Sequence, residues 1–145
     1  MNKKIVLGTD HGGFELKERI KKYLEETGNM VTDIGVLNKD SVDYPDIAFK
    51  ACAEYNAGNY DFGILFCGTG IGISIAANKV KGIRCANVHD LFTAEMAKAH
   101  NNANFLAFGG RIEYQTPVEK LIEKFIQTTY EAGRHERRVS KITCA

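Results

Sequence analysis

Residues 64–76, ILFCGTGIGISIA, join an apolar run to a glycine-rich turn, and Cys67 stands at the junction. The run before Cys67 is continuously apolar, as is typical of a central parallel strand covered on both faces. The glycines at 68, 70 and 72 permit a tight turn and a close approach of the backbone, and the residues that follow can begin a helix. The segment therefore predicts a buried strand, a turn and a helix, with a thiol at the carboxyl end of the strand.

The same alternation continues on both sides of this segment. Strand-like runs lie at residues 4–10, 30–35, 62–68, 84–88 and 105–110, and segments with helical periodicity separate them. The apolar positions with helical spacing are Leu16, Ile20 and Leu24 in one segment and Val118, Leu121, Ile122, Phe125 and Ile126 in another. Pro45 and Pro117 each precede a helical pattern. Strand–helix alternation predicts an α/β fold: a parallel sheet with right-handed crossovers and helices on both faces.

Length and composition set the broad class of protein. The 145 residues fit one domain, and 44% hydrophobic and 26% charged residues with a net charge of +1 describe an ordinary globular protein. We expect no nucleic-acid partner, since the positive charge is not concentrated. We also expect no membrane partner and a cytoplasmic location, because neither an apolar stretch of about 20 residues nor a signal-peptide layout is present. The four cysteines lack zinc spacing and are expected to be free thiols, with no metal bound.

Open parallel sheets bind ligands beyond the carboxyl ends of their strands. The polar or reactive residues that directly follow the predicted strands are Asp10, His11, Cys67, His89, Asp90 and Arg111. The glycine loop at 68–72 suits a phosphate or an oxyanion, although a turn made only for packing stays open. Its spacing matches neither the dinucleotide nor the ATP-binding glycine motif, so we expect no nucleotide cofactor.

Cys67 has two interpretations at this stage. A thiol beside a helix N-terminus can be partly ionised near neutral pH and serve as a base or a nucleophile. Unpaired cysteines are more often small buried apolar residues, and we prefer that interpretation for Cys52 and Cys85. Cys144 is interpreted as a thiol near the chain end.

The other candidates also have structural alternatives. His100 closes a helical pattern and could simply stabilise the end of that helix. Asp10 could cap a following helix, or bind a ligand together with His11. Arg111, Arg134 and Arg138 suit anion binding, yet arginines in a basic segment are commonly solvated. The last two lie in a polar tail, residues 133–145, in which His135 is expected to be solvated.

Several separated motifs in this chain occur together in a known family. GTDHGGFELKERI, VDYPDIA, CGTGIGISIAANKVKGIRCA, AHNNANFLAFGGR and GRHERRVSKI resemble the sugar-phosphate isomerase family that includes ribose-5-phosphate isomerase B and galactose-6-phosphate isomerase. The resemblance runs from residue 4 to about residue 142. Because the motifs follow one another in the family's order, the resemblance is far more specific than the glycine loop alone.

The resemblance implies a Rossmann-like three-layer α/β/α sandwich with a five-stranded parallel sheet and an active site shared across a homodimer. It implies that Cys67 moves a proton between C1 and C2 of an open-chain sugar and that His100 assists ring opening as a proton donor. No cofactor and no metal are implied. The residues implied to bind the substrate, the arginines chiefly through its phosphate, are Asp10, His11, Asn101, Arg111, Arg134 and Arg138.

Elementary chemistry agrees with these roles. A hydrogen next to a carbonyl becomes acidic only if the enediolate left by its removal is stabilised. The amides of Gly68, Thr69, Gly70, Ile71 and Gly72 are candidates for that oxyanion hole. Thr69 is also expected to be a catalytic residue, whose hydroxyl binds sugar oxygens. Cys67 would then sit beside the charge that it creates.

The expected function is interconversion of D-ribose 5-phosphate and D-ribulose 5-phosphate, a step of the pentose phosphate pathway. Two alternatives stay open: isomerisation of a six-carbon phosphate such as allose or galactose 6-phosphate, and binding of a sugar phosphate without catalysis. The presence of both Cys67 and His100 argues against a non-catalytic binder and against one half of a two-subunit enzyme. We expect a homodimer, with tetramers left open, in which the basic tail at 133–145 docks on the partner subunit.

Overall fold

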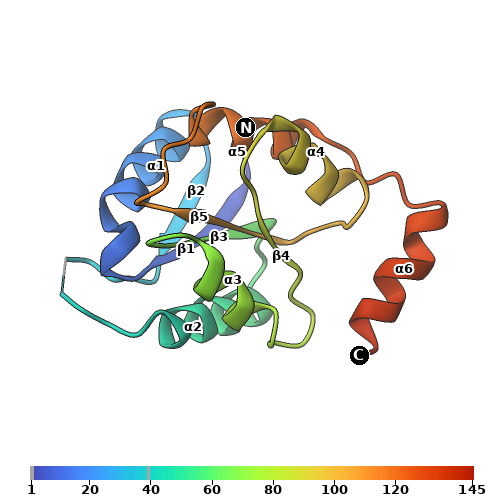
Figure 1. Ribbon diagram of the computed structural model, residues 1–145, viewed down its shortest axis with the longest axis horizontal. Coiled ribbons are helices and arrows are strands. Elements are labelled where there is room, and N and C mark those ends of the chain that lie inside the picture. Colours follow the sequence, from blue (N-terminus) through green and yellow to red (C-terminus); the bar gives the residue numbers. More distant parts are fainter. Residues whose placement is uncertain (1, 39) are drawn as a thin grey trace.

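The computed structural model, which describes residues 2–38 and 40–145, is a three-layer α/β/α sandwich (Figure 1). Its parallel strands are β1 (Lys4–Thr9), β2 (Met30–Asp33), β3 (Phe62–Cys67), β4 (Cys85–Asn87) and β5 (Phe105–Gly109). The helical elements are the 3₁₀ turn η1 (His11–Gly13), α1 (Phe14–Glu26), α2 (Tyr44–Ala57), α3 (Ile71–Ala77), α4 (Leu91–Ala99), α5 (Val118–Gln127) and α6 (Arg134–Thr143). The predicted Rossmann-like fold with a five-stranded parallel sheet is confirmed.

The strand order is β2-β1-β3-β5-β4. Strand β2 lies on one side of β1. The later strands β3, β4 and β5 all lie on the other side of β1. The direction of winding therefore reverses between β1 and β3, and their carboxyl ends flank the crevice where open α/β sheets bind ligands. Asp10 and Cys67 stand at these two ends.

Alternating strand residues divide the core into two layers, because successive side chains of a strand point to opposite faces. On one face, Ile64 and Phe66 of β3 pack with α1, α4 and α5. On the other face, Leu65 and Cys67 pack with α2 and α3. The thiol of Cys67 thus belongs to the layer that contains the helix following the glycine loop.

Local sequence explains the helix boundaries near the sheet edge. Asp90 begins α4 with a capping box, since its Oδ1 accepts a hydrogen bond from Thr93 N at 2.7 Å and Thr93 Oγ1 accepts one from Asp90 N at 3.1 Å. Pro45 lies in the first turn of α2, as expected, and Pro117 directly precedes α5. Within the described residues, no helix has the length and apolar character that crossing a membrane requires.

The C-terminal segment differs from the prediction. Residues expected to form a polar tail after the last helix instead form α6, which stands apart from the sheet layers at the right of Figure 1. His135 and Val139, one turn apart, are its buried residues, whereas Ile142 is 52% exposed. The helix is amphipathic. It was not predicted because its apolar stripe is short and most of its residues are charged or polar.

Candidate active site

The end of β3 presents the Cys67 thiol to the glycine loop. Its Sγ accepts a hydrogen bond from Gly70 N at 3.1 Å, and the residue is 5% exposed. Gly70 has φ +82°, and a Cβ added there would lie 2.7 Å from Asn87 Oδ1 and 3.0 Å from the Phe108 carbonyl carbon. Glycine is therefore required at position 70, both for the backbone angle and for the space. The turn holds a main-chain N–H against the sulfur, where it can stabilise negative charge.

A second amide of the loop is also engaged. Ile71 N donates to Thr69 Oγ1 at 3.1 Å, while the Thr69 side chain lies at the surface. Of the amides predicted to form an oxyanion hole, those of Gly70 and Ile71 thus already have side-chain acceptors. The predicted hole at residues 68–72 consequently depends on Gly68, Thr69 and Gly72, or on replacement of these two hydrogen bonds by the ligand.

Asp10 and His11 follow β1 at the same edge. Asp10 is 6% exposed, and its Oδ1 accepts a hydrogen bond from Gly12 N at 2.8 Å, so the predicted capping interaction is present. Its own amide donates to Phe66 O at 3.2 Å, which ties the end of β1 to β3. His11 is exposed and begins η1. The cap thus engages Oδ1 of Asp10 and fixes the turn that carries His11.

Arg111 reaches the glycine loop from the end of β5. Gly110 N donates to Cys67 O at 2.8 Å and Arg111 N donates to Gly68 O at 3.0 Å. The guanidinium lies close to the loop, because a Cβ added at Gly68 would be 3.0 Å from Arg111 Nη1. The structure thus brings together a group that we call the thiol cluster: Asp10, His11, Cys67, Thr69 and Arg111.

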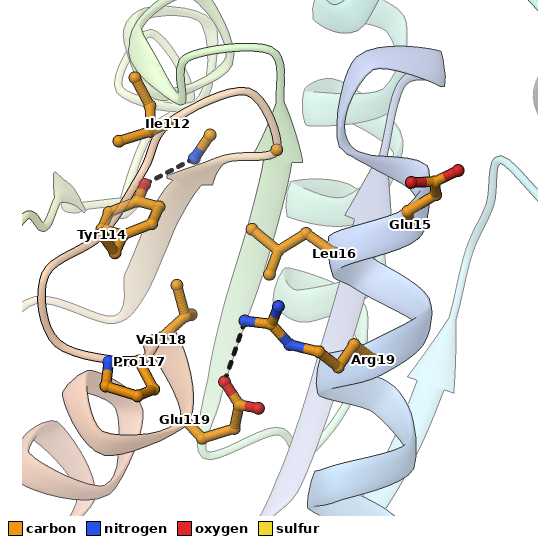
Figure 2. Close-up of a pocket in the computed structure, with 10 residues that line it drawn as sticks. Glu15, Leu16, Arg19, Ile112, Tyr114, Pro117, Val118 and Glu119 are labelled. Atoms are coloured by element: carbon orange, nitrogen blue, oxygen red, sulfur yellow. Dashed lines mark hydrogen bonds and ion pairs between the residues drawn. The ribbon is translucent and has the colours of Figure 1, made fainter.

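Two cavities open beside the thiol cluster. The smaller, about 240 Å³, is lined by His11, Gly12, Glu15, Leu16, Gly110 and Arg111. It shares Glu15, Leu16 and Gly110 with a cavity of about 650 Å³ between α1 and residues 109–119. Figure 2 shows Arg19 paired with Glu119 at 3.1 Å across the larger cavity, and the Tyr114 hydroxyl accepting a hydrogen bond from Gly109 N at 2.8 Å. Tyr114 therefore holds the backbone beside Arg111 in place.

His100 lies in a second group of residues, away from the thiol cluster. It ends α4, and its ring stacks on that of His135 with centroids 4.1 Å apart and planes inclined by 16°. Glu131 Oε1 lies 3.9 Å from His100 Nε2 and 3.6 Å from His135 Nε2. The prediction that His135 is solvated is wrong: the residue is 7% exposed, because α6 turns this side chain toward the end of α4.

The remaining predicted residues adjoin this second group. Arg134 and Arg138 are exposed and stand one turn apart on α6, the helix that carries His135. Asn101 is exposed directly after His100, and its carbonyl accepts a hydrogen bond from Arg84 Nε at 3.3 Å. We call this second group the imidazole cluster: His100, Asn101, Glu131, Arg134, His135 and Arg138.

The two clusters lie at opposite ends of the parallel strands. Cys67 pairs with Gly109 at the carboxyl end of β5, whereas the chain after His100 enters β5 at Phe105. From Phe105 to Gly109 the strand rises by four residue steps, roughly 13 Å at 3.3 Å per residue. Helix α4 connects the carboxyl end of β4 to the start of β5, and therefore places His100, at its C-terminus, at the end of the sheet away from the thiol. One chain therefore places the two predicted proton-transfer residues, Cys67 and His100, apart.

The imidazole cluster is also the only group in the described residues, 2–38 and 40–145, with three potential metal ligands close together. The ligand atoms of His100, Glu131 and His135 lie within 4.8 Å of one another. However, imidazole binds a metal through a lone pair in the plane of its ring, and the planes of the two stacked rings are nearly parallel. A single ion could not lie in both planes, so the observed arrangement does not fit a metal site.

The other cysteines match their predicted interpretations in part. Burial raises the pKa of Cys52 to about 12, and burial also raises the pKa of Cys85, with a smaller effect from Cys52 and Cys67. Thiols held neutral in this way are poor nucleophiles. Cys85 is half-buried rather than fully buried, and Cys144 is exposed beside the end of α6.

Sequence reasoning missed three residues: Glu131 and His135 of the imidazole cluster, and Tyr114 beside the thiol cluster. Glu131 and His135 were not assigned, although His135, Val139 and Ile142 follow an i, i+4, i+7 spacing that indicates a helix with an inward face. Tyr114 has no signal in the sequence, because its function depends on a hydrogen bond to Gly109 that only the folded loop creates.

The fold and the edge site define an α/β protein of the Rossmann-like class, with a thiol at the switch point of the sheet. The family model for Ribose/Galactose Isomerase matches residues 5–142. The chain is 42% identical to ribose-5-phosphate isomerase B of Escherichia coli over 97% of this chain and 95% of that protein. It is also 42% identical to a putative sugar phosphate isomerase of Bacillus subtilis, over 97% of this chain and 95% of that one.

Solved structures agree with this likeness. A ribose 5-phosphate isomerase from Thermotoga maritima has a TM-score of 0.96 at 43% identity, with 100% of both chains covered. A type B ribose 5-phosphate isomerase from Trypanosoma brucei has a TM-score of 0.92 at 42% identity, with 99% of both chains covered. The chain belongs to the ribose/galactose isomerase family.

Proposed function

We propose that this chain is an aldose–ketose isomerase that interconverts D-ribose 5-phosphate and D-ribulose 5-phosphate. Membership of the family and the names of its relatives support the reaction class. The single observation that carries the mechanism is the Cys67 thiol at the switch point, hydrogen-bonded by Gly70 N at 3.1 Å. A base in this position would contact a ligand bound in the crevice, and the Gly70 N–H would stabilise its negative charge.

Proton transfer by Cys67 accounts for the chemistry of the reaction. The thiolate takes the proton from C2 of the open-chain aldose, the electrons of the C–H bond form the C1=C2 double bond, and the carbonyl electrons move to O1. The same thiol then returns the proton to C1, while a proton passes from the O2 hydroxyl to O1, so that O2 becomes the ketone oxygen and O1 a hydroxyl. A positioned base contributes about 10²–10⁴-fold to the rate, so binding of the phosphate and the enediolate must supply much of the remainder.

Ring opening precedes this transfer, because ribose 5-phosphate is mainly a closed ring. The C1–O4 bond breaks, O4 takes a proton from His100, and O1 loses its proton to water as the aldehyde forms. Asp10, His11, Thr69 and Asn101 are proposed to bind the sugar. Arg111, Arg134 and Arg138 are proposed to bind the phosphate, since planar guanidinium groups match its oxygens.

We further propose that two copies of the chain complete each site. His100 lies at the sheet edge opposite Cys67, so the acid that serves a given thiol comes from another subunit. Exposed apolar residues support a subunit interface: Ile71 and Ile75, one turn apart on α3, are 53% and 58% exposed, and Ile142 on α6 is 52% exposed. A cavity of about 830 Å³ between the end of α6 and residues 78–84 leaves space for a docking chain. We therefore propose that residues 133–145 dock on the partner subunit as helix α6, and not as an extended tail.

A coupled assay with both sugar classes tests the reaction. We expect turnover of ribose 5-phosphate, and weaker or no turnover of allose 6-phosphate. Preference for allose 6-phosphate or galactose 6-phosphate would overturn the five-carbon assignment and favour the six-carbon alternative. Binding of all these sugars without turnover would favour the non-catalytic alternative. The proposed setting of the enzyme is the pentose phosphate pathway in the cytoplasm.

A further inference from the structure

Two side chains outside the proposed chemistry contact His100. The ring of His135 stacks on it with centroids 4.1 Å apart, and Glu131 Oε1 lies 3.9 Å from its Nε2. The same carboxylate oxygen lies 3.6 Å from His135 Nε2. One carboxylate therefore faces both imidazoles, while a ring face fixes the plane of His100.

The backbone before α6 brings these side chains into place. Glu131 N donates to Ala99 O at 3.0 Å, which fastens the segment to the last turn of α4. Ala132 and Gly133 then adopt φ values of +55° and +50°, and His135 N donates to Ala132 O at 2.9 Å as α6 begins. This tight turn directs the first buried side chain of α6 onto His100.

The surroundings of the two rings favour a neutral His135. Burial lowers the pKa of His135, with further lowering by His100, Arg134 and Arg138, and only Glu131 opposes the shift. Two imidazolium rings stacked at this distance would repel each other. With His135 neutral, the Glu131 carboxylate, which faces both imidazoles, is left to interact with His100.

The other cations of this region face different partners. Arg84 donates through Nη2 to Asn102 O at 2.8 Å. Lys98 Nζ donates to Asn102 Oδ1 at 3.2 Å and lies 5.6 Å from the centre of the Phe125 ring. Their hydrogen bonds hold the residues after His100 and leave the Glu131 carboxylate facing the imidazoles.

We propose that Glu131 and His135 are positioning residues for His100, which hold its ring in one orientation and join it to the helix that carries Arg134 and Arg138. This inference rests on the proposed ring-opening function of His100. In this arrangement Glu131 and His135 orient the acid. Arg134 and Arg138, on the same helix as His135, bind the anionic group of the substrate. Movement of α6 would then align the acid and the anion site together.

A double-mutant cycle between Glu131 and His100 tests the proposal. A general acid is worth about 10²–10⁴-fold, so we expect His100→Ala to lower kcat about 100-fold. Glu131→Gln keeps the acid but loosens it, so its expected loss is about tenfold in kcat, with KM little changed. In the His100→Ala background, Glu131→Gln should cost nothing further, because its effect acts through the missing ring. Multiplying losses in the double variant would overturn the proposal.

Conservative variants separate positioning from folding. Glu131→Asp should recover part of the activity lost in Glu131→Gln, since it restores the charge. His135→Phe retains a ring face and should retain more activity than His135→Ala, by about fivefold if an aromatic pair is worth about 1 kcal/mol. Lys22→Gln, an exposed change on α1 outside both clusters, is the control and should match the wild type. Equal losses in His135→Phe and His135→Ala would contradict the stacking role.

A measurement without substrate keeps this inference separate from the proposed function. The ring protons of His100 should show an NMR ring-current shift that disappears in His135→Ala and persists in Lys22→Gln. An unchanged His100 signal in His135→Ala would overturn the positioning role, even in an active enzyme. Absence of isomerase activity in a wild-type protein that retains the shift would instead overturn the proposed function.

Discussion

The main-chain N–H of Gly70 donates a hydrogen bond to Sγ of Cys67 at 3.1 Å. The glycine loop therefore touches the residue proposed as base, and does more than connect β3 to α3. Stabilising charge on the sulfur and stabilising charge on the enediolate are tasks for the same few amides. Predictions about the loop and about the thiol are consequently linked.

Replacing the thiol should remove catalysis and leave binding. Cys67→Ala should lower kcat by at least about 100-fold, because a positioned base contributes about 10²–10⁴-fold. Affinity for ribose 5-phosphate, measured by calorimetry, should change little, since the phosphate contacts are retained. Lys22→Gln, an exposed change on α1 away from the thiol cluster, is the control and should keep full activity. Wild-type turnover in Cys67→Ala would exclude this thiol as the base.

The loop itself should not tolerate a side chain at position 70. Gly70 has φ +82°, a region that costs an L-residue roughly 1–2 kcal/mol, and a new Cβ would also meet Asn87 and the Phe108 backbone. We expect Gly70→Ala to lower the unfolding free energy by more than that range and to impair kcat. Gly82→Ala is the control for strain alone, because Gly82 has φ +84° but its nearest neighbour to an added Cβ is 4.0 Å away. Equal unfolding free energies for the two variants would contradict the close packing at Gly70.

Acid should weaken the attachment of α6. Because burial lowers the pKa of His135 below 6.5 in the folded state, the unfolded chain binds the proton more readily. The resulting stability is complete above pH 6.5 and is lost as the pH falls through 6.5 and then through the lower folded value. Thermal melts should therefore show a steeper loss below pH 6.5 for the wild type than for His135→Phe. Parallel curves for the two proteins would contradict burial of a neutral His135.

Complementation between inactive chains tests whether subunits share the site. Cys67→Ala and His100→Ala subunits, unfolded together and refolded, should form mixed dimers that hold one intact site each. Random pairing makes half of the dimers mixed, so roughly a quarter of wild-type activity should return. Recovery of no activity from verified mixed dimers would show that each chain uses its own His100.

Much of the fold was predictable because buried residues recur in the sequence with the spacing of the strand or helix that carries them. The stretch around Ile64 reads as a central strand, and Leu16, Ile20 and Leu24 do lie buried on one face of α1. The carboxyl-edge rule then located Asp10, Cys67 and Arg111, which the structure brings together. The positions of these residues were predictable because each depends on local pattern and on the topology of parallel sheets.

The second cluster could not be predicted in the same way. The contact of His135 with His100 joins a helix that was interpreted as a tail to the end of α4, and local pattern does not record such long-range contacts. Separation of His100 from Cys67 depends on the direction in which α4 runs back along the sheet. Residues assigned to one site by family resemblance thus lie in two places within the chain, and only the folded arrangement shows it.

Exchange of solvent hydrogen into the substrate tests the central claim most directly. Ribose 5-phosphate incubated with the enzyme in D₂O should gain deuterium at C2, because the proton that Cys67 removes exchanges before it returns. Cys67→Ala should leave C2 protonated over the same period, while Lys22→Gln should incorporate deuterium like the wild type. Deuterium at C2 in Cys67→Ala at the wild-type rate, or its absence from the wild type during turnover, would contradict enediolate proton transfer by this thiol.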